Sequence, residues 1–181
     1  MSESAPIPAD DLARQLTVAR PDSDETLTHV GLVGDTYTIL VAGRDTGGRY
    51  TLIDMHVPAG GGPPPHRHDF EEQFSVLEGE IEATFRGEKL RLGAGETINI
   101  PANAPHSFTN PGPAAARLLC MCTPAGQEEF FLKVGQLVAT RTTPPAPLDG
   151  EAQAAFIKLA QELAPKYRTE LLPPPGAAAP A

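Results

Sequence analysis

The sequence predicts a single all-β domain of the sandwich or barrel type. A chain of 181 residues fits one domain with extensions better than it fits two domains. Hydrophobic residues make up 40% of the chain and charged residues 20%, a composition typical of a globular core. Within residues 26–140, short β-rich runs such as Tyr37–Ala42, Tyr50–Val57 and Gln73–Leu77 alternate with Gly, Pro and Asn. Closely spaced strands and turns of this kind favour a sandwich or barrel.

Alternation of apolar and polar residues predicts which side chains face the core. Along one predicted strand Glu72, Phe74 and Val76 share a side, and along the next Ile81, Ala83 and Phe85 share the inward side. The dipeptides Glu78-Gly79 and Arg86-Gly87 are typical of tight turns. We therefore predict a β-meander, three neighbouring antiparallel strands, over residues 72–92.

The barrel is flanked by two extensions. Residues 1–25 form a predicted arm, with one short helix over Asp10–Leu16 whose leucines are four residues apart. Residues 141–172 contain a proline-rich linker and a helix that begins at the capping residue Asp149 and ends before Pro165. Its predicted buried side chains are Phe156, Leu159, Ala160 and Leu163. We expect residues 173–181 to be disordered, because they offer little apolar surface to bury.

The overall charge excludes some classes of partner. A net charge of −9 and a pI near 4.9 oppose binding to nucleic acid or to anionic lipid surfaces. No apolar run approaches the roughly 18–20 residues that span a bilayer, and Met1–Asp10 is unlike a signal peptide. We therefore expect a cytoplasmic protein with a small-molecule substrate, no nucleic acid partner and no membrane partner.

The two cysteines, Cys120 and Cys122, lie two residues apart on a predicted strand, so both thiols point to one face. A thiol pair could bind a metal. However, the stretch lacks a flanking histidine or a second pair, and buried cysteine is commonly a small hydrophobic residue. We favour the packing interpretation.

A cluster of metal-ligand residues is the main functional signal. His66 and His68 are two residues apart, so an extended backbone points both imidazoles the same way, and Glu72 follows on the next strand. His106 comes after a Pro/Asn turn. Three imidazoles and one carboxylate suit a divalent transition metal with open positions. The alternative is that these are exposed loop residues, and Glu71 competes with Glu72 for the carboxylate position.

These residues stand at the spacing of two known motifs. Gly60, His66, His68, Glu72 and Gly79 match G-x5-H-x-H-x3-E-x6-G, and Gly95, Pro101, His106 and Asn110 match G-x5-P-x-G-x2-H-x3-N. Asn103 replaces the glycine of the second motif, and asparagine also tolerates a left-handed backbone. The chain thus resembles single-domain members of the cupin superfamily. This resemblance implies a double-stranded β-helix (jelly-roll) barrel. It also implies one Fe, Mn, Ni, Co, Cu or Zn ion held by His66, His68, Glu72 and His106.

Other segments resemble bacterial quercetin 2,3-dioxygenase-like cupins: Thr46–Tyr50, Val76–Glu80 and Pro124–Phe131. The implied function is dioxygenation of a flavonol-like or other aromatic or enol substrate, with Glu72 as ligand and catalytic base. Phe74, Phe85 and Phe108 share the ligands' alternation phase and are predicted to wall the substrate pocket, and His56 is a further candidate for contact with substrate.

Two other functions stay open. One is a metal-dependent isomerase or lyase of a small keto or sugar acid, which needs basic pocket residues, whereas alternation points Arg67 away. The other is a non-catalytic small-molecule-binding cupin, for which the lack of a helix-turn-helix segment argues against a transcriptional role. By analogy with cupins we also expect a homodimer.

Overall fold

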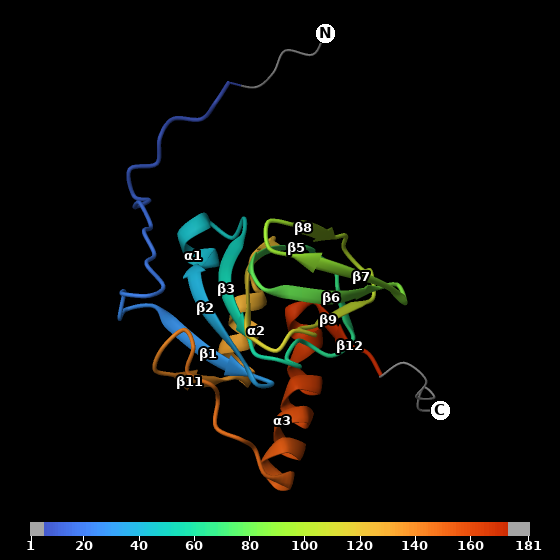
Figure 1. The fold of residues 1–181 in the computed structure, drawn as a ribbon. Helices are drawn as coiled ribbons and strands as arrows, with labels where there is room; N and C mark the ends of the chain where they lie inside the picture. Colours follow the sequence, from blue (N-terminus) through green and yellow to red (C-terminus); the bar gives the residue numbers. More distant parts are fainter. Residues whose placement is uncertain (1–5, 174–181) are drawn as a thin grey trace.

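Two antiparallel β-sheets face each other and enclose the core in the computed structural model, which describes residues 6–173 (Figure 1). The seven-stranded sheet has the order β11 (Gln136–Val138), β1 (Thr28–Leu32), β2 (Asp35–Val41), β3 (Thr51–Val57), β10 (Ala116–Thr123), β5 (Glu71–Glu78) and β8 (Thr97–Ile100). The five-stranded sheet has the order β12 (Thr169–Leu171), β4 (His66–His68), β9 (His106–Thr109), β6 (Glu80–Phe85) and β7 (Glu88–Gly93). The predicted all-β jelly-roll architecture is confirmed.

The predicted core alternation is present, but the predicted meander is wrong in its first half. Phe74, Val76, Ile81 and Ala83 are all buried. Strands β6 and β7 form the expected hairpin, whereas β5 pairs with β10 and β8 instead of β6. The chain changes sheets at Gly79, which has φ 75°. A short turn therefore joins the two layers here and does not join two paired strands.

Four helical segments complete the fold: α1 (Gly43–Thr46), α2 (Gln127–Val134), α3 (Gly150–Leu163) and a 3-10 helix at Ala164–Tyr167. The predicted cap of α3 is confirmed, since the Asp149 carboxylate accepts a hydrogen bond from the Ala152 amide at 2.9 Å. Ala160 is buried as predicted, but Leu159 is 39% exposed. The first turns of α3 project beyond the barrel (Figure 1), and farther along the helix Ala160 is on the buried face whereas Leu159 is on a more exposed one.

The arm before β1 runs along one side of the barrel and then beyond it (Figure 1), and the Arg14 guanidinium donates to the Asp45 carbonyl at 2.7 Å. The helix predicted over Asp10–Leu16 is wrong: the segment makes one turn, in which the Arg14 amide donates to the Asp11 carbonyl at 3.0 Å. Leu12 and Leu16 are 83% and 90% exposed, so no packing stabilises a helix here. The homodimer in which this arm would take part stays a prediction.

The second extension closes one edge of the smaller sheet. Strand β12 pairs with β4, with Thr169 opposite His68 and Leu171 opposite His66, and the Leu172 amide donates to the Pro65 carbonyl at 2.9 Å. Of the tail predicted to be disordered, residues 174–181 lie outside the described part. Within residues 6–173 no helix is long and apolar enough to cross a bilayer.

Candidate metal centre

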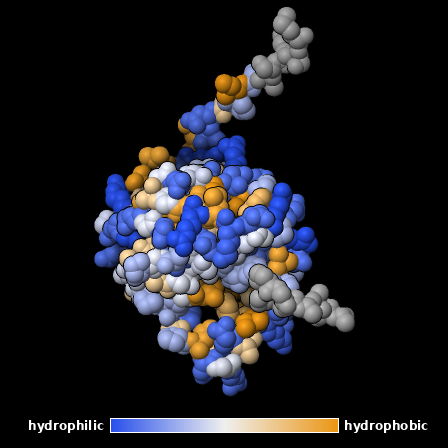
Figure 2. Space-filling view, turned by 45° about the vertical axis from the view of Figure 1, so that its right-hand side comes forward, coloured by the Kyte–Doolittle hydropathy of each residue, from blue (hydrophilic) through white to orange (hydrophobic). Residues whose placement is uncertain are grey.

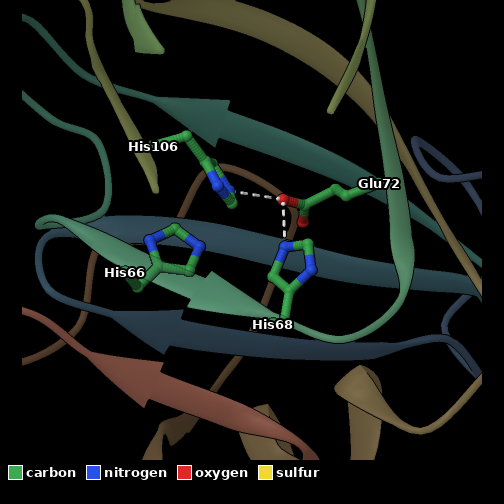
Figure 3. A group of neighbouring side chains, drawn as sticks. All are labelled: His66, His68, Glu72 and His106. Atoms are coloured by element: carbon green, nitrogen blue, oxygen red, sulfur yellow. Dashed lines mark hydrogen bonds and ion pairs between the residues drawn. The ribbon is translucent and has the colours of Figure 1, made fainter. Parts of the chain in front are cut away.

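Both sheets contribute to the candidate centre, which lies between them. His66 and His68 come from β4, His106 from the adjacent β9, and Glu72 from β5 of the opposite sheet. The antiparallel register sets His66 directly opposite His106. All four side chains are buried and converge on one point (Figure 3). The structure therefore brings together the four residues that the sequence predicted as ligands.

Backbone carbonyl groups fix the tautomer of each imidazole in this cluster. In all three histidines Nδ1 lies 2.9 Å from a carbonyl oxygen, which can only accept a hydrogen bond. The acceptors belong to Pro64, Phe70 and Ala104. Each Nδ1 therefore carries the proton, and each neutral ring keeps its Nε2 lone pair for a metal.

The distances around Glu72 fit a bound cation. Its Oε2 lies 3.0 Å from Nε2 of His68 and 3.1 Å from Nε2 of His106. Because Nε2 of a neutral ring here is an acceptor, two acceptors would face each other unless a proton or a cation lies between them. Two ligand atoms about 2.1 Å from one ion at a right angle are about 3.0 Å apart. The spacing suits a transition-metal ion.

The pKa values in the ligand cluster also indicate that Glu72 favours a positively charged neighbour. Burial acts to raise the pKa of Glu72, but hydrogen bonds from His106 and His68 outweigh it and hold that pKa well below its usual range. Burial acts to lower the pKa of His106, and the Glu72 carboxylate more than offsets this and raises it. Burial, with the nearby His106, lowers the pKa of His66 to about 4. The low pKa of Glu72 belongs to the state in which the neighbouring rings are protonated.

Glu71, the competitor for the carboxylate position, faces the other way. Its Oε2 accepts a hydrogen bond from the Asn99 side chain at 2.7 Å, and its Oε1 accepts one from the Ala102 amide at 3.1 Å. Asn103, which replaces the motif glycine, has φ 68°, the left-handed conformation that asparagine tolerates. The departure from the motif therefore leaves the turn before His106 in place.

Both cysteines face the barrel interior and contact Glu72. Its second oxygen, Oε1, lies 3.4 Å from Sγ of Cys120 and 3.7 Å from Sγ of Cys122, and the two sulfur atoms are 3.8 Å apart. Strand register explains the contact, because Cys122 stands directly opposite Glu72 in the β10–β5 pair. The hydrogen bond that the Cys120 thiol donates to Cys122, together with burial, raises the pKa of the Cys120 thiol.

A cavity of about 110 Å³ opens onto His66 and Glu72. Its walls are largely apolar and include the aromatic rings of Tyr37, Phe74, Phe130, Phe131 and Phe156. Gln127 and Thr169 add polar atoms, and among the described residues no lysine or arginine lines it. The site is therefore a small aromatic pocket beside the ligand cluster.

Of the three phenylalanines predicted to wall the pocket, one lines the cavity and two do not. Phe74 lines the cavity, whereas Phe108 is packed behind it with ring centroids 5.1 Å apart. Phe85 is half-buried on β6 opposite His106, outside the cavity lining.

His56 faces the opposite side of its sheet from the cavity. It lies between the inward-facing Met55 and Val57 and stands opposite Arg117, which forms an ion pair with the buried Asp54 on the same outer face. The structure therefore corrects the prediction that His56 contacts substrate. Alternation alone did not show which phase of β3 faces the core.

The aromatic residues of α2 and the polar group of β12 were missed from the sequence. Phe130 and Phe131 lie on α2. Thr169 lies on β12, more than 55 residues along the chain from His106, the nearest candidate ligand. The run Glu128–Val134, with its adjacent phenylalanines, has a helical pattern, but only the resemblance of this segment to other cupins was interpreted from the sequence. Thr169 gave no local signal.

Fold and ligand cluster together define a jelly-roll barrel with a candidate metal site. In agreement, residues 53–122 match the Cupin_2 family model, a cupin domain, so the chain contains a cupin domain. The chain is 38% identical over 72 residues to the quercetin 2,3-dioxygenase of Bacillus subtilis, a match that covers 39% of this chain and 21% of that protein. It is also 40% identical over 58 residues to the HTH-type transcriptional regulator PuuR of Escherichia coli, covering 32% of this chain and 31% of that protein.

The solved structures support the fold. A predicted oxalate decarboxylase from Thermotoga maritima superposes with a TM-score of 0.52 at 20% identity, over 59% of this chain and 98% of that one. The matches to the curated relatives above span only about a fifth to a third of those proteins' length. The relatives thus include both a dioxygenase and a transcriptional regulator.

Proposed function

We propose that this chain is a metal-dependent dioxygenase that acts on a small aromatic or enol substrate carrying a hydroxyl group. The observation that carries the proposal is the cavity: aromatic and aliphatic walls that open onto His66 and Glu72, without a lysine or arginine in the described lining. The similarity to a quercetin 2,3-dioxygenase over 72 residues supports the same class of reaction.

The residues present fit one divalent transition-metal ion, held by His66, His68, His106 and Glu72. Such an ion would supply Lewis acidity toward a substrate oxygen and, when redox-active, reactivity toward dioxygen. The carbonyl groups behind each Nδ1 hold the three imidazoles in one orientation. Glu72 is the carboxylate of the described cavity lining, and it would accept the hydroxyl proton of the substrate.

The cavity also limits the size of the substrate. A cavity of about 150 Å³ holds a single benzene ring, and the volume here is about 110 Å³. A flavonol has three rings and needs more room. A second cavity of about 350 Å³ is adjacent, since both linings include Leu32, Val33, Val134 and Phe156. The first cavity is thus slightly smaller than one that holds a benzene ring. We therefore propose that single-ring phenols or enols enter with a small displacement of the Phe156 side chain, and that larger flavonols need a larger one.

Exposed apolar side chains on α3, the helix that carries Phe156, and just before it fit the same proposal. Figure 2 shows hydrophobic side chains gathered at the lower end of the molecule, where α3 meets the barrel. Ile157, Leu148 and Leu159 on this part of the chain are 44%, 39% and 39% exposed. An apolar substrate would meet an apolar surface on its way to the cavity.

An acidic substrate is disfavoured by the same lining. A keto or sugar acid would bring a carboxylate next to Glu72 with no arginine or lysine in the described lining to balance it. A non-catalytic binding role remains the second candidate, favoured by the match to a transcriptional regulator over 58 residues.

Elemental analysis of the purified and reconstituted protein tests the proposal first. We expect about one equivalent of metal in the parent and its loss in the His66→Ala, His68→Ala double variant. His56→Ala is the matched control: it removes an imidazole from the outer face and should leave the metal content unchanged.

Oxygen uptake then distinguishes the functions. The metal-loaded protein should consume oxygen with catechol, and more slowly with quercetin. Turnover of a keto acid without oxygen would replace the proposal with the isomerase or lyase function. Saturable phenol binding without oxygen uptake in every metal form would replace it with a binding role.

A further inference from the structure

The carboxylate of Glu72 is shared between two sets of donor atoms on opposite sides. Oε2 faces the imidazoles of His68 and His106, whereas Oε1 faces the thiols of Cys120 and Cys122. Glu72 and both cysteines are almost fully buried, at 4%, 1% and 0% exposure. The thiols thus lie on the side of Glu72 away from the imidazoles.

The three atoms on this second side have the spacing of a tetrahedral metal site. With metal–sulfur bonds of about 2.3 Å and a metal–oxygen bond of about 2.1 Å, a tetrahedron places its sulfur atoms about 3.8 Å apart and each sulfur about 3.6 Å from the oxygen. The observed sulfur–sulfur distance is 3.8 Å. The observed sulfur–oxygen distances are 3.4 Å and 3.7 Å.

We propose that Glu72, Cys120 and Cys122 form a second metal site, selective for a thiophilic closed-shell cation of the zinc class. Thiolates select such cations, whereas imidazoles and carboxylates accept most divalent transition metals. Binding of one cation at this site releases the two thiol protons to water. The site needs no residue of the barrel other than these three, and a water molecule can complete the tetrahedron.

The charges allow both sites to be filled together. Two thiolates and one carboxylate carry three negative charges, and the imidazoles are neutral, so two divalent cations leave a net charge of +1 in the core. A carboxylate that gives one oxygen to each of two ions is common in sites with two metals. Glu72 has this arrangement, since its two oxygens face different donor sets.

Simple packing is the competing explanation for the cysteines, and it predicts a different result. Packed thiols would donate weak hydrogen bonds to Oε1 and would bind no metal. Serine at both positions keeps a hydrogen-bond donor of similar size but loses the thiolate. The Cys120→Ser, Cys122→Ser variant therefore separates a metal-binding role from a role in orienting Glu72.

Titration of the full chain with Cd²⁺ tests the proposal, followed by ultraviolet absorption and by elemental analysis. We expect a sulfur-to-cadmium charge-transfer band and a second equivalent of bound metal in the parent. The band should persist in the His66→Ala, His68→Ala variant, which keeps the thiols. In the Cys120→Ser, Cys122→Ser variant the band and the second equivalent should disappear while the first equivalent stays bound.

Absence of the band in the parent would overturn the proposal, and so would loss of the band in the histidine variant. Because the sequence has two cysteines in all, a band in the parent already assigns the ligands, whether or not the serine variant folds. The readout does not involve oxygen uptake. Failure of the dioxygenase proposal and failure of the thiolate site would therefore be distinguished.

Discussion

Asp35 is a buried carboxyl group whose protonation should set the pH dependence of stability. It begins β2 and is completely buried. Its Oδ2 accepts a hydrogen bond from the Tyr37 hydroxyl at 3.2 Å, but among the described residues Oδ1 has no partner. Burial raises the pKa of Asp35 from 3.8 to about 7, more than the Tyr37 hydrogen bond lowers it. The folded protein therefore keeps this proton at pH values where the unfolded chain has lost it.

The sign and size of the effect follow from proton linkage. Between pH 4 and 7 the folded state binds more protons than the unfolded state, so the free energy of unfolding falls as the pH rises. One pKa unit corresponds to about 1.4 kcal/mol, which gives a total of about 4 kcal/mol for the shift. About 3 kcal/mol of this accrues between pH 5 and 8.

The substitution Asp35→Asn removes this titration. We expect the unfolding free energy of the variant, relative to the parent, to rise by about 3 kcal/mol between pH 5 and pH 8. Urea denaturation at constant ionic strength measures it at each pH. Glu88→Gln, at an exposed carboxylate of β7, is the control and should follow the parent. Equal pH dependence in Asp35→Asn and the parent would refute the reasoning.

Three further predictions concern the turn, the surface and the pocket. Gly79→Ala should lower the unfolding free energy by about 1–3 kcal/mol in urea denaturation, because its φ is 75° and the added Cβ would lie 3.0 Å from Ala116 Cα; no change would show that the sheet crossing relaxes freely. Glu170→Gln should change it by less than about 1 kcal/mol, since both partners of the Arg67–Glu170 ion pair are about half exposed; a larger loss would mean that β12 depends on this pair. Phe156→Ala removes a large side chain that lines both cavities and should raise the rate of oxygen uptake with quercetin relative to catechol; an unchanged ratio would place the size limit elsewhere.

The sequence predicted the ligand set well because local spacing determines it. His66 and His68 share a face through the two-residue repeat of a strand, and the motif places Glu72 and His106 at fixed distances from them in the chain. The cap at Asp149 was equally local. In each case the relevant neighbours lie within a few residues, where backbone geometry alone decides the outcome.

Contacts between distant segments were not predictable in the same way. The tight turn at Gly79 looks the same whether it joins paired strands or two layers, and only the pairing of β5 with β10 decides between them. His56 was misplaced because alternation gives two faces without saying which one is inside. The contact of the cysteines with Glu72 depends on strand register across 48 and 50 residues, which no local pattern specifies.

Because β12 pairs with β4, the strand that carries His66 and His68 is supported by a segment that comes much later in the chain than the ligands. All four candidate ligands fall inside residues 53–122, the stretch that matches the cupin family. One of the two strands that pair with His66–His68 is β9, inside this stretch, but the other is supplied by residues 169–171. A nascent chain would therefore have every ligand outside the ribosome well before the backbone of β4 gains its second neighbour. Metal capture during synthesis should lag behind the appearance of the motif and coincide with docking of the last strand.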